Sequence, residues 1–182
     1  PVHLGLDHLP NIYCGVAVFV LLPLYIMCSK VNAREKIGKC VILLIFLTAF
    51  NLNIPNYIWH GMHFPNSLPC RQSFIYIFFL LAMCYEAVIN LKNSTNRQLG
   101  ASLWIAIGLL LIMEELFINS ETEYSFKSVY ISGIFILIYG LLMFIHNNAR
   151  FKIPVVLMLT FSVSIIECTM NMDATGIGTT SR

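Results

Sequence analysis

Charged residues are scarce in this chain. Only 11 % of its 182 residues carry a charge and 58 % are hydrophobic, whereas a soluble domain has about 25 % charged residues. Such an apolar chain indicates a protein whose solvent is the lipid bilayer. The formal net charge of +2 is too small to indicate nucleic acid as a partner.

The chain also lacks an organised cysteine pattern. Five of its six cysteines fall in or beside apolar runs, and no CxxC pair occurs, which argues against a disulfide framework and a cysteine metal centre. No secretory signal pattern opens the sequence. It begins at Pro1 in a loop-like stretch and ends at Arg182 in a polar Thr/Ser segment. We therefore expect an internal fragment of a longer membrane protein, with the catalytic residue outside the fragment.

Long apolar runs are what the chain has in abundance. A membrane-spanning helix needs about 20 mostly apolar residues, and six runs approach this length. The predicted spans are Ile12–Ser29, Lys39–Leu52, Ser73–Leu91, Leu99–Asn119, Ser128–His146 and Ile153–Met170. The predicted fold class is all-α: residues 1–182 form a single polytopic transmembrane helical bundle of about six spanning helices, with both ends external.

The basic residues predict an orientation for this bundle. Eight of the eleven Lys and Arg residues lie in the connections 30–39, 92–98 and 147–152, which follow the first, third and fifth spans. Because short cytoplasmic loops are enriched in Lys and Arg, these connections are expected in the cytoplasm. The loop 51–72 is then external, together with both ends of the chain.

This external loop is the most distinctive stretch, because it is polar and aromatic between two apolar runs. Its Trp59 is expected at the level of the lipid headgroups. His60 and His63 are spaced i, i+3, so both can face one site on a helical turn. They can hydrogen-bond a substrate or exchange protons with it, bind a divalent metal with a carboxylate from another span, or be structural. Two histidines alone are no metal motif, so we expect no cofactor.

Four carboxylates lie inside the apolar runs, namely Glu86, Glu114, Glu115 and Glu167. Because charge is costly within a bilayer, each is expected to face the bundle interior or water. Glu114, Glu115 and Glu167 lie roughly 7–10 Å outward of their helix centres at 1.5 Å per residue. The neighbours Glu114 and Glu115 cannot point the same way. Glu167, one turn before Asn171, is either a water-exposed helix-end group or part of a site, and Glu86 is expected to form an interhelical hydrogen bond.

Arg71 stands just before the third span, on the side that is poor in basic residues. Its planar guanidinium suits a phosphate or a carboxylate. The phosphate can belong to a lipid-linked substrate or to an ordinary phospholipid headgroup, and the sequence leaves both open.

Three stretches carry a resemblance to a known family. The longest is Asn-Tyr-Ile-Trp-His-Gly-Met-His-Phe-Pro-Asn-Ser-Leu-Pro-Cys-Arg-Gln-Ser-Phe at 56–74. The others are Leu-Pro-Asn-Ile-Tyr-Cys-Gly at 9–15, and 167–171 with the ending Thr-Thr-Ser-Arg at 179–182. Over the whole chain, the sequence resembles the YfhO family of bacterial membrane proteins.

The resemblance implies an activity. Such proteins are similar to GT-C glycosyltransferases, whose active site faces outward and whose donor is a polyprenyl-phosphate sugar. In Gram-positive members the implied role is glycosylation of lipoteichoic acid or a related cell-wall polymer. It therefore implies a multi-pass protein of the bacterial plasma membrane, with the lipid bilayer, the sugar donor and the polymer acceptor as partners. The typical catalytic carboxylate lies in the first external loop, which this fragment lacks.

We predict substrate-binding roles for seven residues on this basis. Arg71 would bind the donor phosphate, and Glu167 or Glu114 would assist the acceptor or hold the loop. The sugar or acceptor pocket would be lined by Trp59, His60, His63 and Asn66. These roles are hypotheses from residue chemistry, because the family pattern does not assign them.

Two other functions stay open. In a transporter or flippase, Glu86, Glu114 and Glu167 would line a path, but such paths need ionisable groups near the midplane. The predicted helix centres, around Gly108 and Ser162, are uncharged, which favours the enzyme. A metal-handling permease would use the two histidines and the eight methionines, although the scattered methionines are explained more simply by packing.

Overall fold

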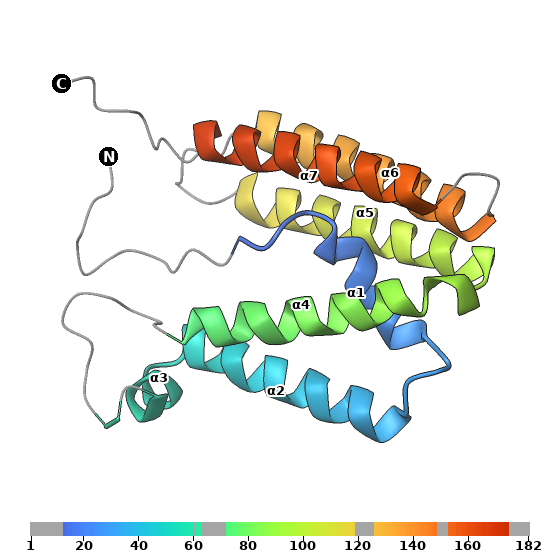
Figure 1. Cartoon of the computed structure of the whole chain (residues 1–182). Coiled ribbons are helices and arrows are strands. Elements are labelled where there is room, and N and C mark those ends of the chain that lie inside the picture. The colour runs from blue at the N-terminus through green and yellow to red at the C-terminus, as the bar shows by residue number, and fades with distance from the viewer. Residues whose placement is uncertain (1–12, 60, 63–71, 119–125, 149–152, 175–182) are drawn as a thin grey trace. The chain divides into compact units, whose positions relative to one another are not determined.

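The computed structural model describes residues 13–59, 61–62, 72–118, 126–148 and 153–174. Within these ranges the chain is helical and contains no strand, which confirms the predicted all-α class. The helices are α1 (Val18–Met27), α2 (Ala33–Asn51), α3 (Asn53–Trp59), α4 (Ser73–Ile89), α5 (Asn96–Ile118), α6 (Phe126–Asn148) and α7 (Ile153–Ala174), with a 3-10 turn η1 (Leu91–Asn93) between α4 and α5. Figure 1 shows these elements along the chain.

The chain divides into two compact units. The first unit comprises Pro1–Cys14 and Val31–Met83, and it contains α2, α3 and the first part of α4. The second unit comprises Gly15–Lys30 and Cys84–Arg182, and it contains α1, the end of α4, η1, α5, α6 and α7. Each unit is described by itself below.

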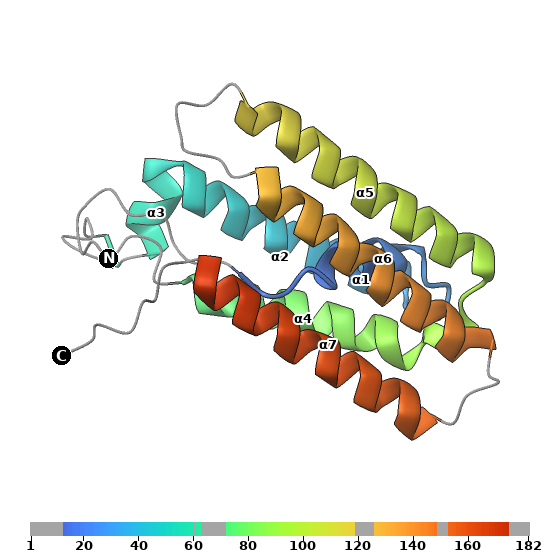
Figure 2. The ribbon, with the colours of Figure 1, turned by 90° about the horizontal axis from the view of Figure 1, so that it is seen from above.

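In the second unit, α6 is the central helix. It packs against both α5 and α7, and α1 contacts both α5 and α6. Figure 2 shows α5, α6 and α7 side by side. Leu24 of α1, Ser102 of α5 and Ile136 of α6 are fully buried in this core. Gly140 lets α5 approach α6 closely, since a Cβ atom there would collide with the side chain of Leu103.

Three helices are long and apolar enough to cross a membrane. Their apolar windows are Asn96–Leu116, Ser128–Asn148 and Pro154–Met172, which correspond to the last three predicted spans. The apolar helices Val18–Met27 and Ser73–Ile89 are shorter. By helix length and composition, the described residues therefore support a membrane protein with three clear spans.

The first predicted span is shorter than expected. Gly15 has a positive φ of 91°, which no right-handed helix accepts, so α1 starts only at Val18. Its ten residues rise about 15 Å, which is roughly half the thickness of the hydrocarbon core. Ile12–Ser29 is thus not one continuous helix.

The second predicted span begins earlier than expected. The side chain of Asn32 accepts a hydrogen bond from the backbone N–H of Arg34 at 3.1 Å and so caps α2. Glu35 and Lys39 form an ion pair at 2.6 Å one turn apart. These polar contacts extend the helix back from Lys39 to Ala33, so the first turns of α2 are charged.

Candidate functional site

Glu167 lies deeper in its helix than the sequence indicated. It is four residues from Val163, the midpoint of the apolar window Pro154–Met172, which corresponds to about 6 Å along the helix. Its side chain is buried, with only 5 % of its surface exposed. The alternative of a water-exposed group at the helix end is therefore wrong, because packing within the second unit covers this carboxylate.

Both carboxylate oxygens of Glu167 accept hydrogen bonds from other parts of the second unit. The backbone N–H of Val16 donates to Oε1 at 2.6 Å. The Tyr139 hydroxyl of α6 donates to Oε2 at 2.6 Å and lies 3.1 Å from the Ser164 hydroxyl of α7. Ser164 in turn donates to the carbonyl oxygen of Thr160. We call Gly15, Val16, Tyr139, Ser164 and Glu167 the Glu167 cluster.

The backbone turn at Gly15 presents the N–H of Val16 to this carboxylate. A Cβ atom on Gly15 would lie 3.7 Å from Oε1 of Glu167, which is an ordinary contact. Space therefore does not require glycine here, but the φ of 91° does, because side-chain-bearing residues rarely adopt it. The turn leads directly into α1, whose Val18 N–H bonds to the carbonyl oxygen of Gly15 at 3.4 Å.

The arrangement of the Glu167 cluster favours holding over reacting. Burying a carboxylate in an apolar span is costly unless donors satisfy it, and here donors come from α6 and from the turn before α1. These bonds join three separate stretches of the second unit through one side chain. Chemically, the cluster can fix the chain that enters α1 against α6 and α7.

Glu114 and Glu115 lie elsewhere on α5. Glu114 is eight residues from Ala106, the midpoint of the window Asn96–Leu116, or about 12 Å along the helix. Its side chain is half-buried, whereas that of Glu115 is exposed. This confirms that the two neighbours face different environments. Glu114 is not part of the Glu167 cluster.

In the first unit, Trp59 packs into a group of aromatic rings. Its ring stacks on Phe46 of α2 with centroids 4.8 Å apart, although 43 % of Trp59 remains exposed. Tyr76 of α4 meets the edge of Phe50 at 5.4 Å and of Phe46 at 6.4 Å. We call Phe46, Phe50, Trp59 and Tyr76 the aromatic cluster. It joins α2 to α3 and to the first part of α4.

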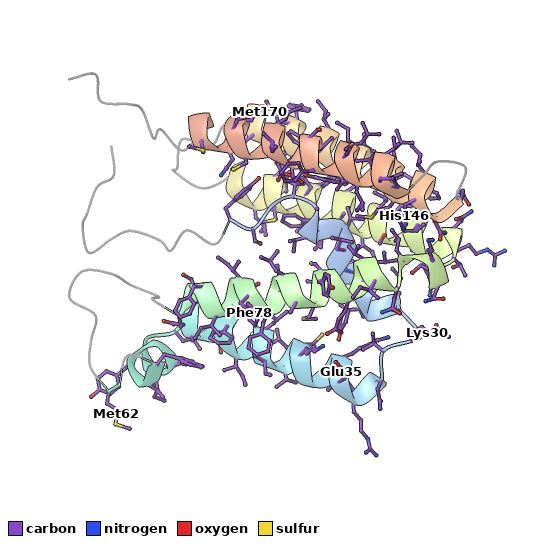
Figure 3. The ribbon with its side chains drawn as sticks, in the orientation of Figure 1. Lys30, Glu35, Met62, Phe78, His146 and Met170 are labelled. Atoms are coloured by element: carbon purple, nitrogen blue, oxygen red, sulfur yellow. The ribbon has the colours of Figure 1, made fainter. Side chains whose placement is uncertain are left out.

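Helix α3 ends in a defined motif directly after Trp59. Gly61 N–H donates to the carbonyl oxygen of Ile58 at 3.1 Å, and Met62 N–H donates to that of Tyr57 at 3.0 Å. Gly61 has a φ of 68°, so this is a Schellman cap, which favours glycine at that position. Met62, beyond the end of α3 in Figure 3, shares the positive φ at 62°.

Four of the predicted site residues, His60, His63, Asn66 and Arg71, lie outside the described residues. Gln72 follows Arg71 and marks the start of α4, where its carbonyl oxygen accepts hydrogen bonds from the N–H groups of Ile75 and Tyr76. Its side chain is buried, and its Nε2 has no hydrogen-bond acceptor among the described residues. In the described ranges, no three His, Cys, Asp or Glu side chains gather as metal ligands.

Sequence reasoning missed the partners of Glu167 and the buried Gln72. Ser164 is three residues before Glu167 on one helix face, which was a readable signal. Tyr139 lies in an apolar run where no neighbouring residue indicates a polar contact. Val16 is 151 residues away from Glu167 in the chain. For Glu86, the side chain of the nearby Asn90 bonds the carbonyl oxygen of Glu86 at 2.9 Å within the same stretch of chain.

Comparison with known proteins places the chain in a family. Neither the curated proteins nor the solved structures gave a significant match. A family model described as bacterial membrane protein YfhO matches residues 3–182, which is nearly the whole chain and confirms the resemblance noted from the sequence. The chain, with its apolar helices of membrane-spanning length, belongs to the YfhO family of bacterial membrane proteins.

Proposed function

We propose that this chain is part of a multi-spanning glycosyltransferase of the bacterial plasma membrane. It would act on the outer face, taking a sugar from a polyprenyl-phosphate donor and transferring it to a cell-wall polymer such as lipoteichoic acid. Membership of the YfhO family supports a bacterial membrane protein, and the resemblance to GT-C enzymes supplies the reaction class. The catalytic carboxylate would be contributed by a part of the full-length protein outside these residues.

The proposed orientation has six spans with both ends external. It is supported by the concentration of Lys and Arg in 30–39, 92–98 and 147–152. In this arrangement α1 and α4 each span the membrane with the help of their flanking residues, since both helices are shorter than a full span. The loop 51–72, the Glu114 end of α5 and the later part of α7 then face the side where a flipped lipid-linked donor is met.

The aromatic cluster is the observation that carries this proposal. Trp59 and Tyr76 stand on either side of residues 60–71, and both contact rings of α2. The two flanks of the loop are therefore packed against one helix, which suits a binding element better than a loose connector. In our proposal, Arg71 binds the donor phosphate, with Trp59, His60, His63 and Asn66 lining the sugar or acceptor pocket.

Gln72, the residue after Arg71 in the sequence, adds a hydrogen-bond donor. A buried amide N–H group without an acceptor costs free energy, and in our proposal a donor phosphate or sugar hydroxyl supplies the acceptor. Glu167 has a different role, which is to hold the chain before α1 against α6 and α7. Glu114, at the same proposed side, remains a candidate for assisting the acceptor.

The direct test replaces Arg71 and His63 separately by alanine in the full-length protein. Glycosylation of the cell-wall polymer is measured in cells, with membrane expression checked for each variant. We expect Arg71→Ala to reduce glycosylation at least about tenfold, because a charge-assisted phosphate contact is lost, and His63→Ala to reduce it less. Arg34→Ala, an exposed arginine of the 30–39 connection, is the matched control and should leave glycosylation unchanged. Normal glycosylation in both loop variants would contradict the proposal.

Orientation is tested independently by labelling Cys70. A membrane-impermeant thiol reagent applied to intact cells should react with Cys70 in a variant whose other cysteines are replaced by serine or alanine. Labelling only after the cytoplasmic side is exposed would overturn the proposed topology, and with it an outward-facing site.

A transporter or flippase is the second candidate, and the depth of Glu167 favours it. An ionisable group about 6 Å from a helix midpoint is what a proton-coupled path requires. Glu167→Gln separates the two functions in the full-length protein, since glutamine keeps the shape and one acceptor oxygen but does not titrate. A holding role predicts that glycosyl transfer survives, whereas a proton path predicts loss of coupled transport.

A further inference from the structure

Three exposed cations lie at one end of the second unit. Lys30 follows α1, Lys92 lies in η1 and Arg97 lies in the first turn of α5. In Figure 3, Lys30 appears at the same end of this unit as His146 of α6. This end is thus formed by the last turns of α1 and α6 and by the first turn of α5.

Side-chain amides tie these three helix ends together. Gln98 of α5 donates to the carbonyl oxygen of Met27 of α1 at 2.9 Å. Asn147 of α6 donates to the carbonyl oxygen of Ser94 and to Oδ1 of Asn96, both at 3.1 Å. The backbone that carries the three cations is therefore held by hydrogen bonds between helices, and their spacing is fixed more firmly than on a free loop.

The first turn of α5 is fixed by a capping box as well. Thr95 N–H donates to Oε1 of Gln98 at 2.8 Å, and Gln98 N–H donates to Oγ1 of Thr95 at 3.3 Å. This reciprocal pair is a strong helix-start signal. Arg97 lies between the two residues, so its backbone position is set by the cap.

The charge of this end is unbalanced. Among the described residues, none of the three cations forms an ion pair. The other described carboxylates of this unit are placed elsewhere: Glu114 and Glu115 near the other end of α5, Glu167 in its own cluster, and Asp173 in the last turn of α7. Glu86 is the nearest in sequence, six residues before Lys92. The end therefore presents positive charge to whatever lies beyond it.

By helix length and composition, this end is expected near the lipid headgroups. The apolar helix of membrane-spanning length in α5 begins at Asn96, so we expect Arg97, the second residue of this helix, close to the headgroup layer. Long Lys and Arg side chains extend along apolar surface and keep their charge in the polar layer. An arginine fork beside ammonium groups is suited to a phosphate diester.

We propose that Lys30, Lys92 and Arg97 form a binding site for the headgroup of an anionic phospholipid. The amide-tied ends of α1, α5 and α6 hold the three cations around one phosphate. The site is separate from the proposed sugar transfer, and it does not depend on which side of the membrane this end faces.

The test uses the full-length protein in detergent, titrated with phosphatidylglycerol and with phosphatidylcholine of the same acyl chains. Bound lipid is counted by native mass spectrometry. The double variant Lys92→Gln/Arg97→Gln should weaken phosphatidylglycerol binding at least about tenfold, since each cation near a membrane surface contributes roughly fivefold. The matched control, Arg34→Gln/Lys36→Gln, removes the same charge from the first unit and should weaken phosphatidylglycerol binding clearly less than the double variant, because it leaves the proposed site intact.

The charge-conserving variant Lys92→Arg/Arg97→Lys should retain binding, which separates charge from folding. Inorganic phosphate at millimolar concentration should not displace the lipid, because the acyl chains contribute to binding. Equal weakening in the double variant and its control would mean diffuse attraction and would overturn the site. Equal affinity for the two lipids, or displacement by inorganic phosphate, would overturn the anionic lipid as its ligand.

Discussion

The aromatic cluster of the first unit and the Glu167 cluster of the second hold their chain segments by opposite means. The first uses ring contacts between Trp59, Phe46 and Tyr76. The second uses hydrogen bonds from Val16 and Tyr139 to a buried carboxylate. Ring contacts weaken gradually as a ring is trimmed, whereas a buried polar group that loses its partner is penalised in full. The second unit should therefore be the less tolerant of substitution.

Glu167→Leu should have the largest effect. It leaves the Val16 N–H and the Tyr139 hydroxyl without their acceptor, at roughly 1–3 kcal/mol for each buried donor, so we expect a loss of about 2–4 kcal/mol in unfolding free energy. Thermal unfolding of the purified protein in detergent measures it. Glu115→Leu, at an exposed position of α5, is the control and should stay within about 0.5 kcal/mol. Equal losses would remove the distinction between the two carboxylates.

Trp59→Ala should come next. The stacked ring contributes about 0.5–1.5 kcal/mol beyond its buried area, and because 43 % of Trp59 is exposed we expect a total loss of about 1–2 kcal/mol. Trp104→Ala is the matched control, since Trp104 is 75 % exposed on α5. Thermal unfolding of both variants gives the difference in unfolding free energy between them. A Trp104 variant as unstable as the Trp59 variant would show that ring stacking does not hold α3.

Gly15→Ala tests the backbone turn of the Glu167 cluster. Alanine at a φ of 91° is strained by about 1–2 kcal/mol, and any relaxation moves the Val16 N–H away from Glu167. Gly108→Ala, at an open position within α5, should instead be neutral or stabilising by up to about 1 kcal/mol. The two substitutions should shift the melting temperature in opposite directions. An unchanged melting temperature for Gly15→Ala would exclude strain from alanine at this turn.

Tyr139→Phe should have the smallest effect of the four. It removes one hydroxyl, and hydrogen bonds between membrane helices contribute about 0.6 kcal/mol on average, so we expect a loss of about 0.5–1.5 kcal/mol, the range of a typical hydrogen bond. Tyr130→Phe on the same helix is the control, because Tyr130 is 68 % exposed. If both variants unfold at the same temperature, the hydrogen bond from Tyr139 to Glu167 contributes nothing to the stability of the protein.

The sequence was sufficient to predict those helices that are recognisable from their amino-acid composition alone. The runs that became α5, α6 and α7 are apolar over a full membrane thickness, so length alone identifies them. It failed for the first span, since the positive φ at Gly15 delays the start of a helix that composition predicts from Ile12. That conformation accompanies the hydrogen bond from Val16 to Glu167, a contact over 151 residues that no local pattern contains.

The candidate site was predictable only in part. Glu167 stood out as a carboxylate in an apolar run, but its partner Tyr139 is 28 residues away and unremarkable by type. Which residues meet across helices depends on packing register, and close-packing glycines such as Gly140 set that register. The expectation for Trp59 rested on aromatic chemistry, and the structure adds its specific partner on α2.

The central claim is that Glu167 holds α6 and α7 together through Tyr139, and a double-mutant cycle measures this directly. Unfolding free energies are compared for the wild type, Tyr139→Phe, Glu167→Leu and the double variant. We expect the double variant to lose less than the sum of the single losses, with a coupling of about 0.5–3 kcal/mol, as for contacting residues. Additivity within about 0.3 kcal/mol, as for residues that do not interact, would contradict the account.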